Sequence, residues 1–306
     1  MSTQKPREIA FRVLLEHRDG AHFLEYVLER AFAKGTISPP DRALAQELTF
    51  GVTRWEKTLD WLIAQKARAR PAKPALEILL RLGLYQLFWL DRIPDHAAVN
   101  ETVELAKRVG FKSQAGFINA VLRGFLRERE ATRQKLVELR ERDPASGLSH
   151  PDWLYQRWRE RYGEAGTRRL MEWNNQTPPT YARVNAIKAD AAKLMEAWKS
   201  ESVQVRACQF DWVPDNTVFE LVEHPPLASL KSFQDGWFYI QDPSTLLSVH
   251  ELAPSPGETI LDMCAAPGGK TTYIAALMNN QGKLVATDLS PGRLELVRQN
   301  LSLIHI

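Results

Sequence analysis

The segment from Leu261 to Lys270, Leu-Asp-Met-Cys-Ala-Ala-Pro-Gly-Gly-Lys, has the residue types of a turn that cradles a nucleotide. Residues 259–261 before it indicate a short buried strand. Pro267-Gly268-Gly269 lets the backbone approach a ligand, because glycine has no Cβ atom to clash with it. Residues 271–278 then indicate a helix, whose first N–H groups would face the ligand. The pattern predicts a strand, a tight turn and a helix around a nucleotide.

A carboxylate follows at the separation that a nucleotide site requires. Lys283-Leu-Val-Ala-Thr-Asp288 indicates a second strand that ends in an acidic residue. This strand comes about twenty residues after the turn, where many nucleotide-binding folds place the acid that hydrogen-bonds the ribose hydroxyls. Together the two segments indicate a cofactor that contains adenosine.

The spacing of the glycines separates three classes of cofactor. A P-loop requires glycine five positions before Gly269, where Cys264 stands, so Gly269-Lys-Thr271 matches only the end of that motif. A dinucleotide fingerprint requires a third glycine, which is missing after Gly268 and Gly269. An adenosyl ligand without a pyrophosphate needs fewer glycines. S-adenosylmethionine therefore fits the turn best.

Four segments carry a resemblance to a known family. The turn from Cys264 to Lys270 and the segment from Phe233 to Ser244, Phe-Gln-Asp-Gly-Trp-Phe-Tyr-Ile-Gln-Asp-Pro-Ser, resemble the RsmB/Sun group of RNA cytosine-5 methyltransferases. Residues 181–185, Tyr-Ala-Arg-Val-Asn, are similar to that family's Arg-Val-Asn segment. Residues 41–62 are similar to the NusB-like RNA-binding domain at the start of RsmB. The resemblance covers the chain up to about residue 300.

The expected cofactor site consists of the turn and the later acid. We expect the backbone of residues 265–269 to approach the methionine end of S-adenosylmethionine, and Asp288 to bind the ribose. Lys270 is expected to face either the methionine carboxylate or a catalytic acid. The full set of predicted cofactor-binding residues is Cys264, Ala265, Ala266, Pro267, Gly268, Gly269, Lys270 and Asp288.

Methylation of cytosine carbon 5 requires a cysteine thiolate that adds to carbon 6, which makes carbon 5 able to attack the sulfonium methyl. The resemblance implies that this cysteine lies in a Thr-Cys loop and a second cysteine in a Pro-Cys loop, both after the cofactor turn and its next strand. The chain has only Cys208 and Cys264, and we expect neither to be the nucleophile. We place the nucleophile beyond residue 306 and predict no catalytic residue within the chain.

The same comparison leads us to expect a truncated, inactive enzyme. Only two strands and two helices of a doubly wound sheet follow Gly257. The final residues, Leu301 to Ile306, resemble one reading frame of a transposon sequencing adapter, so we leave residues 301–306 out of the fold prediction.

The elements that position this site divide into three predicted domains. They are an all-α NusB-like RNA-binding bundle over 1–142, a small accessory α+β domain over 148–235, and the start of an α/β Rossmann-like methyltransferase domain over 236–306. Helical spacing in the bundle predicts helices over 6–16, 23–32, 41–65, 76–90, 95–109 and 113–129. The helix over 76–90 is apolar almost all round, so we expect it at the centre. Residues 129–150, with Asp143-Pro-Ala-Ser-Gly147, indicate a helix tail and a linker.

The accessory domain mixes helices with short strands. We expect helices over 150–161, 164–173 and 190–199, and strands over 180–184, 203–207, 218–221 and 236–240. In the family this segment packs on the methyltransferase sheet and lines the RNA cleft. Arg183 and Asn185 are the candidate RNA contacts there, and a capped strand end is the alternative.

The charge of the chain is unevenly distributed. Residues 1–142 carry 25 Lys and Arg against 18 Asp and Glu, whereas residues 143–306 carry 15 against 19. A basic front joined to an acidic remainder indicates that the front binds a polyanion. The candidate RNA contacts, for which a solvated helix face is the alternative, are Lys66, Arg68, Arg70, Lys73, Lys107, Arg108, Lys112, Arg123 and Arg127.

Composition narrows the class of protein further. Two cysteines in 306 residues exclude a disulfide framework and suit a reducing cytoplasm. The N-terminus has no apolar signal segment, and Arg81, Gly83 and Gln86 interrupt the most apolar stretch, residues 79–90. We expect a cytoplasmic protein whose partner is RNA, with ribosomal RNA ahead of transfer RNA. We expect no membrane and no metal partner, and the oligomeric state stays open with a monomer favoured.

The function predicted from the sequence is S-adenosylmethionine-dependent cytosine-5 methylation of RNA, with small-subunit ribosomal RNA as the substrate. The alternative is a non-catalytic RNA-binding protein, similar to a transcription antitermination factor, with a vestigial methyltransferase domain. An S-adenosylmethionine enzyme acting on protein or a small molecule is a third possibility, which the basic helical front disfavours.

Overall fold

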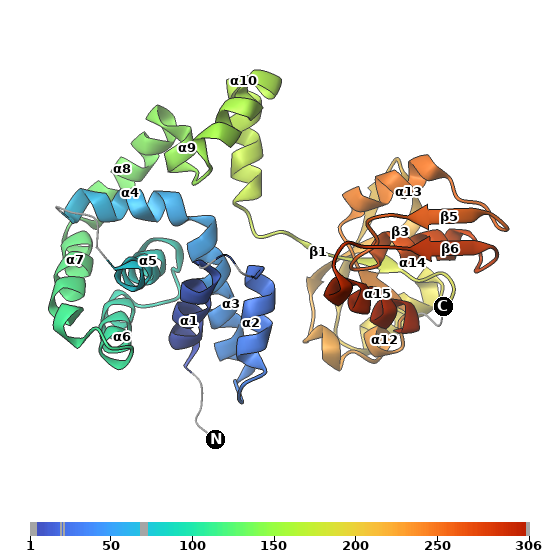
Figure 1. Cartoon of the computed structure of the whole chain (residues 1–306), viewed down its shortest axis with the longest axis horizontal. Coiled ribbons are helices and arrows are strands. Elements are labelled where there is room, and N and C mark those ends of the chain that lie inside the picture. Colours follow the sequence, from blue (N-terminus) through green and yellow to red (C-terminus); the bar gives the residue numbers. More distant parts are fainter. Residues whose placement is uncertain (1–4, 19, 21, 68–72, 304–306) are drawn as a thin grey trace. The chain divides into compact units, whose positions relative to one another are not determined.

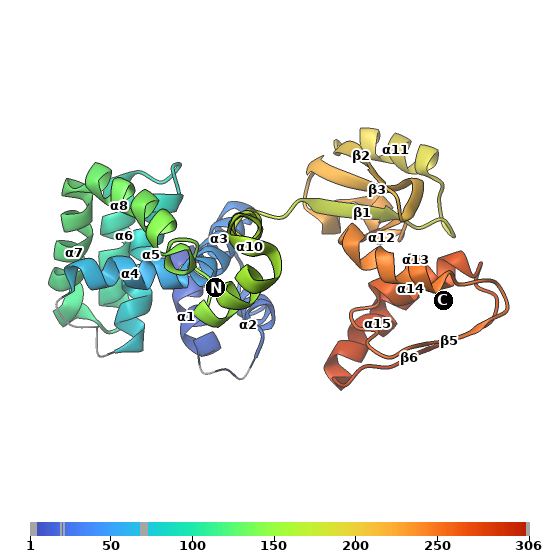
Figure 2. The same cartoon turned by 90° about the horizontal axis from the view of Figure 1, so that it is seen from above.

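The computed structural model describes residues 5–18, 20, 22–67 and 73–303. The chain forms two compact units, residues 1–176 and residues 177–306. Figures 1 and 2 show that helices make up the first unit and that the second contains both sheets.

Every element described in the first unit is helical. The order is α1 (Pro6–Arg18), α2 (Leu24–Phe32), α3 (Pro39–Arg54), α4 (Glu56–Lys66), α5 (Pro74–Trp89), α6 (Asp95–Arg108), the 3₁₀ turn η1 (Lys112–Gln114), α7 (Ala115–Arg127), α8 (Arg129–Arg142), α9 (Pro144–Gly147) and α10 (Asp152–Asn174). Local chemistry sets several of the helix starts. The Ser38 hydroxyl accepts a hydrogen bond from the Asp41 N–H at 3.3 Å, and Pro39 supplies the first residue of α3.

Helix α5 is the centre of the first unit. Its residues 75–87 are all buried, and it packs against α1, α3, α4, α6 and α7. Figure 1 looks along α5 and shows these helices around it. The prediction that this helix is buried at the centre of the bundle is confirmed. Burial of each large apolar side chain here contributes about 1.5–3 kcal/mol before the loss of conformational entropy is counted.

The expectation of one continuous helical segment over 41–65 is wrong. The helix breaks at Trp55, whose φ of −101° and ψ of 16° end α3 and begin α4. Leu48, Val52, Leu59 and Leu62 keep their helical spacing on both sides of the break and all reach the core. Because the apolar pattern continues without interruption, it does not reveal the change of direction.

The linker predicted within residues 129–150 is also wrong. Helix α8 continues to Arg142, and the Asp143 carboxylate then accepts the Ser146 N–H at 3.2 Å and caps α9. Gly147 packs so closely that a Cβ atom there would lie 2.5 Å from the Arg140 Cα atom. Proline and glycine look like linker residues in the sequence, but here they start and close a buried helical turn.

Helix α10 completes the first unit. Gly163 interrupts it with a φ of 69° and a ψ of 175°, which confirms the two helices expected over 150–161 and 164–173. Tyr155 and Met171 of α10 bury against Ala145 of α9. The first compact unit thus includes helix α10, which the predicted boundaries at 142 and 148 assign to the accessory domain. The three-domain division stays a prediction.

The second unit begins with an antiparallel sheet. Its strands are β1 (Thr180–Val184), β2 (Gln204–Phe210), β3 (Val213–Glu223) and β4 (Phe238–Ile240), in the spatial order β2-β3-β1-β4. The connecting helices are α11 (Ala191–Ser200), the turn η2 (Leu227–Ser229) and α12 (Lys231–Gln234). Strand β4 lies beyond the domain boundary predicted at residue 235, yet it pairs with β1.

The rest of the second unit follows the sheet and contains the predicted cofactor turn, and we call it the nucleotide-type half. It consists of η3 (Pro243–Leu246), α13 (Leu247–Leu252), β5 (Thr259–Asp262), α14 (Gly269–Leu277), β6 (Lys283–Ala286) and α15 (Pro291–Leu303). Strands β5 and β6 pair in parallel, with Asp262 opposite Ala286. This is the start of the α/β fold expected from the sequence, and it lies after a small α+β segment as predicted.

The antiparallel sheet is covered on both faces. Neighbouring residues of β3 point in opposite directions, so Phe219 packs on Trp198 of α11 while Val218 packs with Ile274 of α14. Figure 2 shows α11 on one side of the sheet and α13 and α14 on the other. The sheet therefore shares a core with the nucleotide-type half.

Two further structural features do not occur among the described residues. No helix among them is long and apolar enough to cross a membrane. The described part of the chain also contains no group of three His, Cys, Asp or Glu side chains that could hold a metal ion.

Candidate functional site

The predicted cofactor turn lies between β5 and α14, and both of its glycines are required. Gly268 has a φ of 113°, a conformation that side chains with a Cβ atom rarely adopt. A Cβ atom on Gly269 would lie 3.0 Å from Nε2 of Gln241. The first glycine therefore serves the turn itself, and the second allows a close approach to the segment after β4.

Asp262 organises the turn from the end of β5. Its buried carboxylate accepts hydrogen bonds from the Cys264 N–H at 3.3 Å and from the Thr271 hydroxyl at 2.7 Å. These contacts tie the start of the turn to the first turn of α14. Sequence reasoning missed this role, although an acid at the end of a strand before a glycine-rich turn is a readable signal.

Asp288 reaches the same turn from the end of β6. Its carboxylate accepts the Ser290 N–H at 3.1 Å and the Ala266 N–H at 3.1 Å. The pKa of Asp288 is lowered, first by the hydrogen bond from Ser290 and then by the one from Ala266. The carboxylate is therefore ionised at neutral pH, and its remaining lone pairs can accept further hydrogen bonds. The structure thus brings Asp288 and the turn together.

Lys270 lies at the start of α14 and is half-buried. Among the described residues, the structure shows no hydrogen bond or ion pair for its ammonium group. The neighbouring backbone is held from β6, since the Ala265 N–H donates to the Thr287 carbonyl at 2.9 Å. A cation beside a fixed turn is available for an anionic ligand group.

Two side chains of α15 hold the turn from a further side. Arg293 donates to the Ala266 carbonyl at 3.2 Å, and Asn300 donates to the Pro267 carbonyl at 2.7 Å. The two residues are seven apart and share one face of the helix. The sequence predicts the helix but not this role, for which the only signal is a pair of polar residues spaced along one face.

The two cysteines of the chain lie in different surroundings. Cys208 lies on β2 with its thiol 3.6 Å from the Arg206 carbonyl, and burial raises the pKa of the thiol. Cys264 is exposed and belongs to the cofactor turn, where its N–H bonds Asp262.

The structure places the two candidate RNA contacts of the accessory segment in the interior. Arg183 is 2 % exposed and Asn185 is 3 % exposed. The Asn185 amide donates to the Gly236 carbonyl at 2.8 Å and accepts the Ile187 N–H at 3.3 Å. Asn185 is therefore the capped strand end that the sequence left as the alternative.

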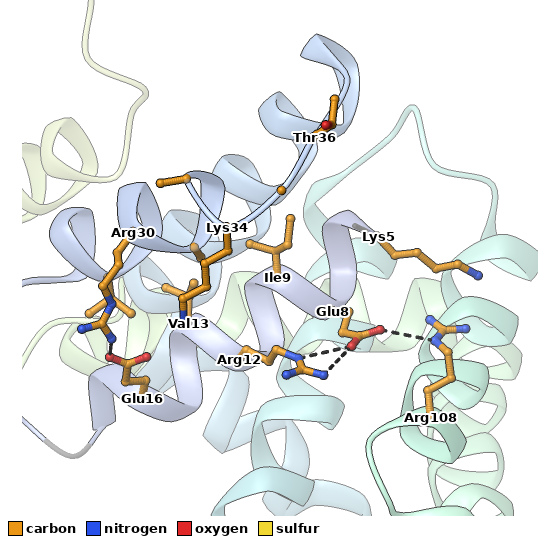
Figure 3. A pocket seen from close by; sticks show the side chains of 14 residues that line it. Lys5, Glu8, Ile9, Arg12, Val13, Glu16, Arg30, Lys34, Thr36 and Arg108 are labelled. Carbon is orange, nitrogen blue, oxygen red and sulfur yellow. Dashed lines mark hydrogen bonds and ion pairs between the residues drawn. The ribbon is translucent and has the colours of Figure 1, made fainter. Parts of the chain in front are cut away.

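The first unit contains a hollow of about 880 Å³, which we call the α1–α2 groove. Charged side chains line it from the residue before α1, from α1 and α2, from the segment after α2 and from the end of α6. They are Lys5, Glu8, Arg12, Glu16, Arg30, Lys34 and Arg108. Figure 3 shows Lys5, Glu8 and Arg108 toward one end and Arg30 with Glu16 toward the other. Five cations and two acids give these side chains a surplus of positive charge.

The acids of the groove are already paired. Glu8 bonds Arg12 at 2.7 Å and lies 3.7 Å from Arg108, and Glu16 pairs with Arg30. Lys5 and Lys34 are exposed, and the described structure shows no carboxylate partner for either. The two lysines are therefore the cations most available to a ligand.

The RNA contacts predicted in the bundle fall in different places. Lys66 pairs with Glu128 at 2.9 Å, and Lys107 pairs with Glu104 at 2.6 Å. Arg68 and Arg70 lie outside the described residues. Among the described members of the predicted set, Arg108 alone lines the α1–α2 groove. The remaining described candidates lie elsewhere on the bundle, namely Lys73, Lys112, Arg123 and Arg127.

Three family profiles match successive parts of the chain. The NusB family matches residues 4–127, and the ferredoxin-like domain of RsmF/B-like methyltransferases matches residues 150–215. The 16S rRNA methyltransferase RsmB/F family matches residues 249–306, which include the cofactor turn.

A solved structure shows a similar fold. The crystal structure titled PH0851 has a TM-score of 0.74 and 20 % sequence identity, and the match covers 100 % of this chain and 68 % of the other.

Curated relatives match nearly the whole chain. The probable ribosomal RNA small subunit methyltransferase B of Synechocystis sp. is 35 % identical over 309 residues, which cover 98 % of this chain and 68 % of the relative. The probable enzyme of the same name from Bacillus subtilis is 33 % identical over 311 residues, covering 100 % and 68 %. The three profiles match in order along the chain, and relatives at least 33 % identical match nearly all of it. The chain therefore belongs to the family of ribosomal RNA small subunit methyltransferase B, the RsmB family.

Proposed function

We propose that this chain binds S-adenosylmethionine at the turn between β5 and α14 and serves cytosine-5 methylation of small-subunit ribosomal RNA. The contact of Asp288 with the Ala266 N–H carries the cofactor part of the proposal. It places an ionised carboxylate, with free lone pairs, beside a glycine-rich turn. The names of the relatives support the RNA part.

The residues of the turn fit such a cofactor. Gly268 and Gly269 leave the backbone open to close approach, Asp288 would accept the ribose hydroxyls, and Lys270 would face the methionine carboxylate. The bound cofactor supplies an electrophilic sulfonium methyl group. Asp262 and Arg293 fix the turn from two directions and would hold the backbone that contacts the cofactor.

We assign the nucleophilic thiolate to neither cysteine of the chain. Burial raises the pKa of Cys208, whereas a nucleophile needs a lowered one. Cys264 is part of the proposed cofactor turn.

We also propose that the first unit binds the RNA backbone through the α1–α2 groove. A surplus of cations attracts phosphates, and within the described structure Lys5 and Lys34 form no ion pair with an acid. Binding to ribosomal RNA would place the protein in the cytoplasm, where both thiols stay reduced.

Calorimetric titration of the chain with S-adenosylmethionine tests the cofactor site. Replacing Asp288 by Ala removes an ionised hydrogen-bond acceptor, so we expect affinity to fall by about tenfold to a hundredfold. Glu295→Ala is the matched control, because Glu295 is an acid on α15 that contacts Arg298 rather than the turn. Equal affinity of wild type and Asp288→Ala would refute the ribose role.

Incubation with methyl-labelled cofactor and RNA tests the reaction. In a protein that combines this chain with a nucleophilic cysteine, the expected product is small-subunit ribosomal RNA with the label in 5-methylcytosine. Label in protein or a small molecule would contradict the substrate. RNA binding by a protein that does not bind the cofactor would instead favour a non-catalytic RNA-binding role.

A further inference from the structure

Arg183 of β1 is a buried cation that faces neutral partners. Its Nε donates to Oε1 of Gln241 at 2.8 Å, and its Nη2 donates to the Thr272 hydroxyl at 2.8 Å. The described structure shows no ion pair between its guanidinium and a carboxylate. Burial lowers the pKa of Arg183 to about 10, so the group remains charged at neutral pH.

Two aromatic rings flank the guanidinium. Its central carbon lies 4.9 Å from the ring centre of Tyr273 and 5.8 Å from that of Tyr239. The electron-rich ring faces attract a cation and offset part of the cost of burying it. The charge is therefore held by ring faces and two hydrogen bonds, without an acid.

Three of the four partners of Arg183 contact residues that hold the cofactor turn. Thr272 lies in the first turn of α14, and its hydroxyl donates to the Gly269 carbonyl at 3.0 Å. The Gln241 amide packs against Gly269, whose Cβ position would lie 3.0 Å from Nε2. Tyr239 accepts a hydrogen bond from Asn300 at 2.9 Å, and the same amide bonds the turn at Pro267. Three separate routes thus join Arg183 to residues 267–269.

The position is electrostatically unfavourable for a cation. The first turn of α14 carries the partial positive charge of a helix N-terminus, which repels the guanidinium of Arg183. An apolar side chain of similar volume would fill the space without the cost of desolvating a charge. What the guanidinium adds is two directed hydrogen bonds that fix Gln241 and Thr272 relative to β1.

We propose that Arg183 is a positioning residue for the cofactor turn. Through Thr272 and Gln241 it holds the start of α14 and residues 267–269 in place from the antiparallel sheet. The antiparallel sheet thereby helps to fix the geometry of the cofactor site. The relevance to S-adenosylmethionine rests on the proposed function, whereas the positioning itself does not.

Hydrogen exchange of the ligand-free chain tests the positioning directly. We expect Arg183→Lys to speed exchange at the Ala266 and Thr272 amides by about tenfold relative to amides of β3, because lysine cannot make both hydrogen bonds. Thr272→Val removes the hydroxyl with little change of volume and should have a similar effect. In the double variant the second change should add little, since both break the same link.

Val184→Ala is the matched control. Val184 is the next residue of β1, it is buried on the opposite face against α11, and it does not contact the turn. The control should lower the melting temperature while the ratio of exchange between the turn and β3 stays within about twofold of wild type. An unchanged ratio in both Arg183→Lys and Thr272→Val, or an equal rise in Val184→Ala, would overturn the proposal.

Cofactor titration of the same variants separates this inference from the proposed function. Affinity for S-adenosylmethionine should fall by about tenfold in Arg183→Lys and stay near wild type in Val184→Ala. If wild type binds no S-adenosylmethionine, the proposed function fails, and the exchange ratios still decide whether Arg183 positions the turn. If wild type binds and Arg183→Lys binds equally well, Arg183 does not act on the cofactor site.

Discussion

Some side chains of the cofactor site can be predicted from the sequence, whereas the roles of others depend on how the chain packs. The sequence predicts the turn and the acid after β6, because glycine spacing and a strand-end acid are local signals. It does not predict that Arg293 and Asn300 bond the carbonyls of the turn, since these contacts depend on how α15 packs. Arg183 is expected at an RNA cleft, whereas its side chain is buried beneath the turn.

The lowered pKa of Asp288 gives a testable pH dependence. A carboxyl with a lowered folded-state pKa contributes stability above its unfolded pKa of about 4, and this contribution is lost as the pH falls through the folded value. The difference in melting temperature between wild type and Asp288→Asn should be constant near neutral pH and should narrow only in that acidic range. A difference that narrows near pH 6 would contradict the lowered pKa.

For helices and strands, local sequence signals predict that an element exists better than they predict the residues at which it begins and ends. The sequence predicts β1 with the bounds that the structure has, but it predicts only residues 218–221 of β3, which spans residues 213–223. In the first part of β3, Val213 pairs with Phe210 of β2 across an irregular register, and the side chains of residues 214–216 are exposed. Pairing of this kind leaves no apolar pattern to read.

Contact between α3 and α5 gives a prediction for the bundle. A Cβ atom on Gly51 would lie 2.1 Å from Cζ of Tyr85, which is buried and donates its hydroxyl to Glu47 at 2.5 Å. Gly51→Ala should therefore lower the free energy of unfolding by about 1–3 kcal/mol, despite the better helix propensity of alanine.

Urea unfolding monitored by fluorescence measures this effect, and Gly116→Ala is the control. Gly116 also lies within a helix, α7, but a Cβ atom there would meet nothing within 4 Å. Its replacement should be neutral or stabilising. Equal effects of the two substitutions would show that Tyr85 can move aside freely.

Across the whole molecule, the uneven distribution of charge along the sequence predicts a basic N-terminal region. It does not predict where the cationic side chains cluster in the folded structure. The predicted loop and helix-end cations include Lys66 and Lys107, which are paired with acids. The α1–α2 groove instead combines Lys5 and Lys34 from segments far apart in the sequence with the end of α6. Only folding brings these groups together, so a count of charges along the chain cannot locate them.

Charge reversal at the groove tests its role in RNA binding. The variant Lys5→Glu/Lys34→Glu should weaken binding to a ribosomal RNA fragment and reduce the slope of log affinity against log salt by about 1.4–1.8, the value for two phosphate contacts. Arg133→Glu/Arg142→Glu, two exposed residues of α8 outside the groove, makes the same change of net charge. If both variants lose affinity equally, overall charge and not the groove drives binding.

The core shared by the antiparallel sheet and the nucleotide-type half has a consequence for recombination among relatives. Val218 of β3 and Ile274 of α14 belong to one buried cluster, and Arg183 bonds across the same junction. A crossover between these halves would join surfaces shaped in different parents and leave mismatched side chains at the junction. Residues 177–306 therefore depend on one another for packing. Chimaeric proteins made from relatives should exchange these residues together, as one segment.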